Sequence, residues 1–250
     1  MMLRLIYKDL YLSRKTIIAM VLYPMTVPLM MTAIKIFETS VPTAADEAAM
    51  AMTVTLTHLM LGILVYCSVD MVMDTVMKSD ENRGWMSFAI SSPVTAEGQV
   101  REKYLIYVLT VSVMMFYAYA CHLFLMASVG NDTTLFGATY MMLLINCVTK
   151  AAELPLMFRF GARRGANIRM GAIGLLIFFG MLYGLFGDLS IFGDKEELVN
   201  RIFKFLENGT ESKPVIAIAV LFPYIAGAAL YISYRISVKV YVKGAEEHDQ

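Results

Sequence analysis

Only a few ionisable residues of this sequence interrupt its hydrophobic stretches. Asp70, Lys150 and Glu153 each lie within a long apolar run. A charged side chain near the centre of a membrane-spanning helix costs about 2.5–3.5 kcal/mol, so each requires a partner or water. We expect Asp70 and Lys150 to face the interior of a helical bundle and either pair or line a water-filled cavity. Glu153 is an alternative partner for Lys150, and snorkelling of Lys150 to lipid headgroups is a third arrangement.

The sequence contains no recognisable catalytic or metal-binding constellation. A Walker-type phosphate loop and a Gly-x-Ser-x-Gly nucleophile turn are both absent. His58 and His122 stand alone in separate apolar runs, His248 lies in the tail, and no two of them have metal-ligand spacing. The three cysteines fall inside apolar runs without paired spacing, as buried thiols do. We therefore expect no enzyme activity, no metal and no cofactor on this chain.

The elements that position these residues are predicted to be membrane-spanning helices. The chain has 250 residues, 58% of them apolar and only 17% charged, whereas soluble domains are about 45–50% apolar and about 25% charged. Six stretches of 17 to 28 residues carry no charge, and a helix needs roughly 20 apolar residues to cross the bilayer core. The net charge is zero and no basic arm is present, so nothing indicates a nucleic-acid partner.

The predicted fold class is an all-α integral membrane protein with a single domain over residues 1–250. An amphipathic interfacial helix over residues 1–14 is expected first, because Leu3, Ile6, Tyr7 and Leu10 form one apolar stripe. A short extracellular helix is expected between spans five and six. The predicted spans cover residues 16–36, 48–74, 104–129, 133–158, 168–187 and 214–236.

The distribution of basic residues predicts the orientation of the chain. Fifteen Lys and Arg residues fall in the two termini and in the connections after spans two and four, and five fall in the other connections. The positive-inside rule places the richer side in the cytoplasm, so both termini are expected there. Four of these residues are expected to contact lipid phosphates or a partner: Arg159, Arg163, Arg164 and Arg169. The alternative is that they only fix the orientation of the chain in the membrane.

An unusual amphipathic insert separates spans two and three. Residues 79–95 combine an acidic start with the only tryptophan of the chain, and Trp85 and Phe88 lie on one helical face. Such a short helix with an aromatic face is typical of a docking surface, and a helix lying on the membrane with Trp85 as anchor is the alternative. The residues expected to contact a partner are Asp80, Glu81, Arg83, Trp85, Phe88, Ser92 and Pro93.

The order of several motifs resembles the permease subunit of a bacterial type-2 ABC exporter. The first is the N-terminal helix with Lys8-Asp9-Leu10 and Arg14-Lys15. The second is Asp80-Glu81, followed by Ser92-Pro93-Val94 and by Glu102-Lys103-Tyr104-Leu105, with Ser92 where leucine is usual in the family. The third is the run Pro155-Leu156-Met157-Phe158-Arg159-Phe160-Gly161 at the end of span four.

The resemblance implies a homodimer, or a pair of related permeases, above two copies of a separate ABC ATPase that binds ATP and magnesium. Residues 79–95 would form the coupling helix that docks in a groove of the ATPase. The expected location is the bacterial cell membrane. The sequence is similar to small permeases that export phenol-soluble modulins, which are amphipathic peptides; other members of the family export antimicrobial peptides or drugs.

Two further expectations concern the substrate and the energy source. The chain has 21 methionines, whose flexible side chains suit apolar surfaces that accept varied peptides or hydrophobic small molecules, although they also serve as lipid-facing residues. The alternative to an ATP-driven permease is a secondary transporter or channel without an ATPase partner. A co-purifying ATPase would distinguish the two.

Overall fold

The computed structural model describes residues 2–37, 44–82, 95–129, 136–186 and 213–248, and over these residues the secondary structure is helical. The helices are α1 (Met2–Leu12), α2 (Arg14–Phe37), α3 (Ala44–Asn82), α5 (Ala96–Val129), α6 (Phe136–Phe160), α7 (Ala162–Phe186) and α9 (Lys213–His248). The all-α class predicted from the sequence is thus confirmed for the described residues.

Five of these helices are long and apolar enough to cross a membrane. The qualifying segments are Arg14–Ile36, Thr53–Glu81, Glu97–Ala127, Phe136–Phe160 and Ala162–Tyr183. They correspond to the first five predicted spans. The sixth predicted span falls within α9, which is not among the five, so it stays a prediction.

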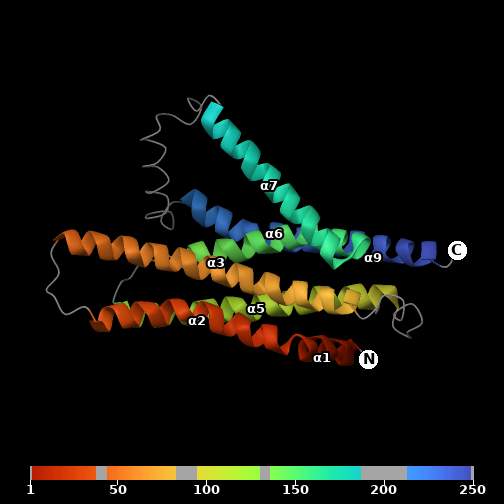
Figure 1. Ribbon diagram of the computed structural model, residues 1–250, viewed down its shortest axis with the longest axis horizontal. Helices are drawn as coiled ribbons and strands as arrows, with labels where there is room; N and C mark the ends of the chain where they lie inside the picture. The colour runs from red at the N-terminus through yellow and green to blue at the C-terminus, as the bar shows by residue number, and fades with distance from the viewer. Residues whose placement is uncertain (1, 38–43, 83–94, 130–135, 187–212, 249–250) are drawn as a thin grey trace.

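Four of the spanning helices and α9 form an elongated bundle, from which α7 diverges (Figure 1). α2, α3, α5, α6 and α9 run along the long axis of the molecule. The two termini lie at the same end, together with the end of α3, the start of α5 and the junction of α6 with α7 (Figure 1). This end, which we call the terminal end, therefore brings together segments that are far apart in the sequence.

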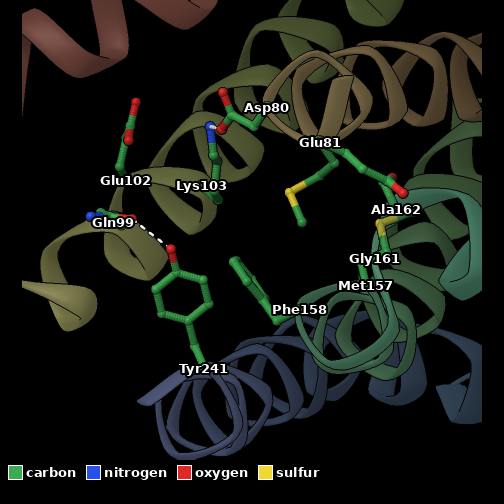
Figure 2. A pocket seen from close by; sticks show the side chains of 11 residues that line it. Asp80, Glu81, Gln99, Glu102, Lys103, Met157, Phe158, Gly161, Ala162 and Tyr241 are labelled. Carbon is green, nitrogen blue, oxygen red and sulfur yellow. Dashed lines mark hydrogen bonds and ion pairs between the residues drawn. The ribbon is translucent and has the colours of Figure 1, made fainter. Parts of the chain in front are cut away.

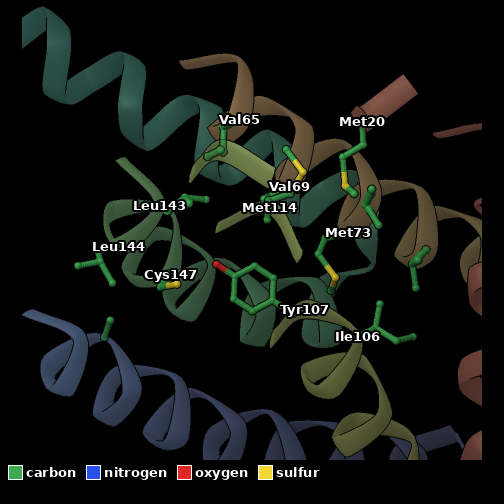
Figure 3. Packing of buried hydrophobic residues seen from close by; sticks show 14 of the residues in the cluster. Met20, Val65, Val69, Met73, Ile106, Tyr107, Met114, Leu143, Leu144 and Cys147 are labelled. Carbon is green, nitrogen blue, oxygen red and sulfur yellow. The ribbon is translucent and has the colours of Figure 1, made fainter. Parts of the chain in front are cut away.

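The interior of the bundle is filled by branched aliphatic, methionine and tyrosine side chains. Val65, Val69 and Met73 repeat along one face of α3 and are completely buried, at the i, i+4 spacing that places residues on one side of a helix. Tyr107 and Met114 of α5 lie in the same cluster (Figure 3). Methionines occur both in this core and on the exposed surface.

The first helix exposes part of its apolar stripe, packs Ile6 against the core and buries Asp9. Leu3 is 81% exposed and Tyr7 is 70% exposed, whereas Asp9 is 2% exposed. Ser13 at the end of α1 is also buried, and its hydroxyl donates to the carbonyl oxygen of Asp9 at 2.6 Å. An apolar face that points away from the protein suits a helix lying in the membrane interface, as the sequence predicts.

Two predicted elements lie outside the described residues. The aromatic part of the insert after α3 and the extracellular helix between spans five and six both fall there. The beginning of α5 is described, and the predicted helix start at Thr95 is confirmed. The Thr95 hydroxyl accepts from the backbone N–H of Gly98 at 3.2 Å, which is an N-cap hydrogen bond.

A single residue, Gly161, separates α6 from α7. Its φ of +87° is in the left-handed region, which glycine adopts at the end of a helix without steric penalty. Four residues later, a Cβ on Gly165 would lie 2.9 Å from backbone atoms of Met157. The first turn of α7 therefore packs directly against the backbone of α6.

We predict that Gly161→Ala destabilises the protein by about 1–2 kcal/mol, because an alanine pays the left-handed penalty. Its Cβ would also lie only 3.1 Å from Oε1 of Glu81. Gly171→Ala is the matched control, since a Cβ there meets nothing within 4 Å. Unfolding by SDS, followed by circular dichroism, measures both variants. Equal stability of the two variants would contradict this account of the junction.

Candidate functional site

The centre of the candidate site is Lys150 of α6, whose side chain is completely buried. Its ammonium nitrogen lies 3.1 Å from Oδ1 of Asp70 and 3.2 Å from Oδ1 of Asp74, both on α3. On its own helix, Oε2 of Glu153 is 2.7 Å away. The structure thus brings Lys150 together with both of the partners considered from the sequence, and it adds Asp74.

Arg169 of α7 completes this group of charges. Its guanidinium contacts Oδ2 of Asp70 and lies 3.0 Å from Oε2 of Glu153. Asp70 therefore uses one oxygen for Lys150 and the other for Arg169. We call the set Asp70, Asp74, Lys150, Glu153 and Arg169 the membrane cluster; it joins α3, α6 and α7.

Neutral hydrogen bonds extend the membrane cluster to α5. The side-chain amide of Asn146 donates to Oδ1 of Asp70 at 3.2 Å, and the Tyr107 hydroxyl donates to Oδ1 of Asn146 at 2.8 Å. Asn146 and Tyr107 are both completely buried. Since Tyr107 belongs to α5, these bonds orient the Asp70 carboxylate from a fourth helix.

The pairing accounts for the presence of so many charges in an apolar bundle. Three carboxylates face two cations in the membrane cluster, and the Lys78 ammonium, 3.4 Å from Oδ2 of Asp74, provides a third cation. Mutual attraction and hydrogen bonds offset the desolvation of each ion only when the geometry is good. Among the residues that the structure describes, Oε1 of Glu153 and Nε of Arg169 nevertheless meet no hydrogen-bond partner, so these residues leave the cluster not fully satisfied.

A second group of charges lies at the terminal end, about 15 Å along α3 from Asp70 at 1.5 Å per residue. The buried Lys103 ammonium, from the first part of α5, contacts both Asp9 of α1 and Asp80 of α3. Lys8 lies 3.0 Å from Oδ1 of Asp9 and 3.3 Å from Oδ1 of Asp80. We call Lys8, Asp9, Asp80 and Lys103 the end cluster.

An open pocket with about 500 Å³ of empty space lies beside the end cluster. Figure 2 shows the Asp80 and Lys103 side chains directed toward each other, with Phe158 and Tyr241 on the opposite side. The Tyr241 hydroxyl donates to Oε1 of Gln99 at 2.7 Å. Burial raises the pKa of the Tyr241 phenol and the nearby Asp80 carboxylate raises it further, so the group stays protonated as a donor.

The α6–α7 junction lies on another side of this pocket. Glu81, the neighbour of Asp80 on α3, accepts a hydrogen bond at Oε2 from the backbone N–H of Arg163 at 3.1 Å. Arg163 is the second residue of α7, so the bond satisfies one of the four N–H groups that a helix leaves open at its beginning. The two carboxylates predicted for docking therefore have intramolecular partners.

The other residues predicted for the site fall into three groups. Those of the insert lie outside the described residues: Arg83, Trp85, Phe88, Ser92 and Pro93. Arg159, Arg163 and Arg164 are exposed around the α6–α7 junction. Arg169 does not share their surface: its guanidinium points into the membrane cluster, because Asp70 and Glu153 offer it two carboxylates there.

The sequence reasoning missed several members of these clusters, although spacing along the helices could have identified some of them. Asp74 is four residues after Asp70, and Asn146 is four residues before Lys150. Residues at this spacing share one face of a helix, so they accompany any inward-facing charge. The end cluster had no such signal, because its members come from three separate helices.

The two histidines are closer together than the sequence suggested. Nδ1 of His122 lies 3.4 Å from Nε2 of His58, and both side chains are buried between α3 and α5. The expectation that they stand alone is therefore wrong. Within the described residues, no group of three or more His, Cys, Asp or Glu side chains is arranged to hold a metal ion.

Long apolar helices with buried, paired charges define a multi-pass membrane protein, and the comparison with known families specifies its class. The chain matches the family described as ABC-2 family transporter protein over residues 4–242. It therefore belongs to this family and is the membrane component, or permease, of an ABC transporter. No curated protein and no solved structure matches it.

We predict that Lys150→Met destabilises the protein by about 3–5 kcal/mol, because it leaves buried carboxylates without their cation. The matched control is Lys78→Met, which removes a lysine whose side chain is 41% exposed and pairs with Asp74. The control should cost about 1 kcal/mol or less. Thermal unfolding in one detergent compares the two, and equal effects would mean that Lys150 is not the centre of the cluster.

Proposed function

We propose that this permease forms the translocation pathway of an ATP-driven exporter and receives energy from a separate ATPase through residues 79–95. ATP and magnesium would bind to the ATPase, and this chain would carry no cofactor. The observation that carries the proposal is the end cluster. Lys103, in the first part of α5 just after the insert, holds Asp80 at the start of the insert and also Asp9 of α1.

This arrangement suits the transmission of force. Both ends of the insert are held by buried ion pairs, and the strength of such pairs in an apolar environment resists their separation. A displacement of the insert by a partner would therefore move α3 and α5, rather than only a loop. Because α3 also carries Asp70 and Asp74, the same displacement would reach the membrane cluster.

The proposed assembly contains two permease chains, either identical or related, and two ATPase subunits in a bacterial cell membrane. Both termini lie at the terminal end, which would face the cytoplasm and the ATPase. The exposed apolar side chains of α1 would contact lipid, as would the arginines around the α6–α7 junction. Asp80 and residues 83–95 would form the docking region, because the carboxylate of Glu81 is already bonded to the backbone N–H of Arg163.

The proposed substrates are amphipathic or hydrophobic peptides, toxins or drugs, which includes peptides resembling phenol-soluble modulins and antimicrobial peptides. The abundance of methionine in the chain, 21 residues, supports this proposal, because methionine adapts its shape to varied apolar surfaces.

A secondary transporter or channel without an ATPase is the second candidate. The membrane cluster favours it, since ionisable groups within a bilayer frequently belong to proton or ion pathways. Purification of the chain from native membranes distinguishes the candidates. A stoichiometric ATPase whose hydrolysis is stimulated by amphipathic peptide supports the exporter, whereas transport driven by an ion gradient alone supports the alternative.

We predict that Trp85→Ala weakens the association with the ATPase by about 2 kcal/mol or more, as expected for an aromatic residue at the centre of an interface. Phe116→Ala is the control, because Phe116 is an aromatic side chain that is 77% exposed within the α5 span. Titration of the ATPase onto the reconstituted permease measures the affinity. Wild-type affinity and normal peptide-stimulated hydrolysis in the Trp85 variant would refute the docking role of the insert.

A further inference from the structure

Within the part of the chain that the structure describes, helix α7 packs against the bundle mainly through its first part. Residues 170–181 of α7 are all exposed, and Gly171, Gly174 and Gly180 have open space at the position of a Cβ. In Figure 1 this part of α7 points away from the bundle. The described contacts that hold the helix thus lie between its beginning and Arg169.

Three contacts hold this first part. Glu81 of α3 accepts from the N–H of Arg163 at the start of the helix. Gly165 packs against the backbone of Met157, one turn later. Arg169 pairs with Asp70 and Glu153 after two further turns. Side chains of α3 make two of these contacts and residues of α6 take part as well, so α3 and α6 together hold the direction in which α7 leaves the bundle.

The backbone between α6 and α7 permits a change of this direction. Gly161 is the single connecting residue, and glycine has the widest range of backbone angles. A small rotation at Gly161 is enlarged along the 25 residues of α7, about 37 Å at 1.5 Å per residue. The Glu81 carboxylate, which also occupies the space beside Gly161, is the contact nearest to this glycine among the three that limit the rotation.

We infer that Glu81 is a positioning residue that connects the insert after α3 to the direction of α7. Glu81 belongs to the acidic start of the insert and lies in the last turn of α3, one residue before the helix ends at Asn82. A displacement of the end of α3 therefore moves the carboxylate that holds the first turn of α7. This inference rests on the proposed function, in which a partner moves the insert, and it gives Glu81 a role within the chain instead of a contact with the ATPase.

Two variants separate these roles. Glu81→Ala removes the acceptor and the charge, whereas Glu81→Gln removes the charge and keeps an acceptor for the Arg163 N–H. Glu97→Ala is the matched control, since Glu97 is an exposed carboxylate on the other side of the insert and bonds to Tyr234 instead. If Glu81 acts through the hydrogen bond, the Gln variant behaves as wild type; if it acts as a docking charge, the Gln variant behaves as Ala.

The first measurement uses the permease alone, reconstituted in nanodiscs. Spin labels at Leu176 of α7 and Phe116 of α5, both strongly exposed, report the distance between the two helices; the three native cysteines are replaced by alanine in every sample. We expect Glu81→Ala to broaden the distance distribution, and Glu81→Gln and Glu97→Ala to leave it unchanged. An unchanged distribution in Glu81→Ala would overturn the inference whatever the energy source of the transporter.

The second measurement adds the ATPase and traps it with ATP and vanadate. We expect the wild-type distance to shift. Glu81→Ala should bind the ATPase normally but lose this shift and the stimulation of hydrolysis by peptide. Weaker ATPase binding by both Glu81 variants would assign Glu81 to docking and overturn the inference. A wild-type chain that binds no ATPase would instead refute the proposed function.

Discussion

A buried charge needs an opposite charge, and this requirement fixes how α3, α6 and α7 are arranged. Lys150 is completely buried, so its ammonium must be surrounded by carboxylates, and those of Asp70, Asp74 and Glu153 all turn toward it. Apolar packing in lipid has little directional preference, since lipid tails are as apolar as the helix surfaces. Ion pairs and hydrogen bonds are directional, and they can therefore specify the register of one membrane helix against another.

The same physical rule operates at the terminal end for a different purpose. There Lys103, in the first part of α5, pairs with residues near the ends of α1 and α3. The membrane cluster instead joins the inner parts of α3, α6 and α7. The exposed fraction differs as well: the Lys8 side chain is 26% exposed, and that of Lys150 is not exposed. Solvent screening therefore weakens the pairs that Lys8 makes and hardly affects those of Lys150. α3 connects the two clusters and contributes carboxylates to both.

The sequence predicted the features that depend on local pattern. Apolar run lengths predicted the five qualifying helices, Thr95 predicted the beginning of α5, and the cost of burying charge led to the group around Lys150. It did not predict contacts that depend on how helices are placed in space. Arg169 has an ordinary position eight residues after Gly161, and only the turn at that glycine brings its guanidinium to Asp70. The pair of His58 and His122 was missed for the same reason.

The two oxygens of Asp70 have different partners, and this has a consequence for which sequence changes the protein can tolerate. Replacement of Asp74 leaves Lys150 with two carboxylates, and Arg169 keeps both of its own. Replacement of Asp70 takes a carboxylate from both cations at once and removes an acceptor from Asn146. Although the two aspartates are one turn apart on the same helix, variation at position 70 is thus far more restricted than variation at position 74.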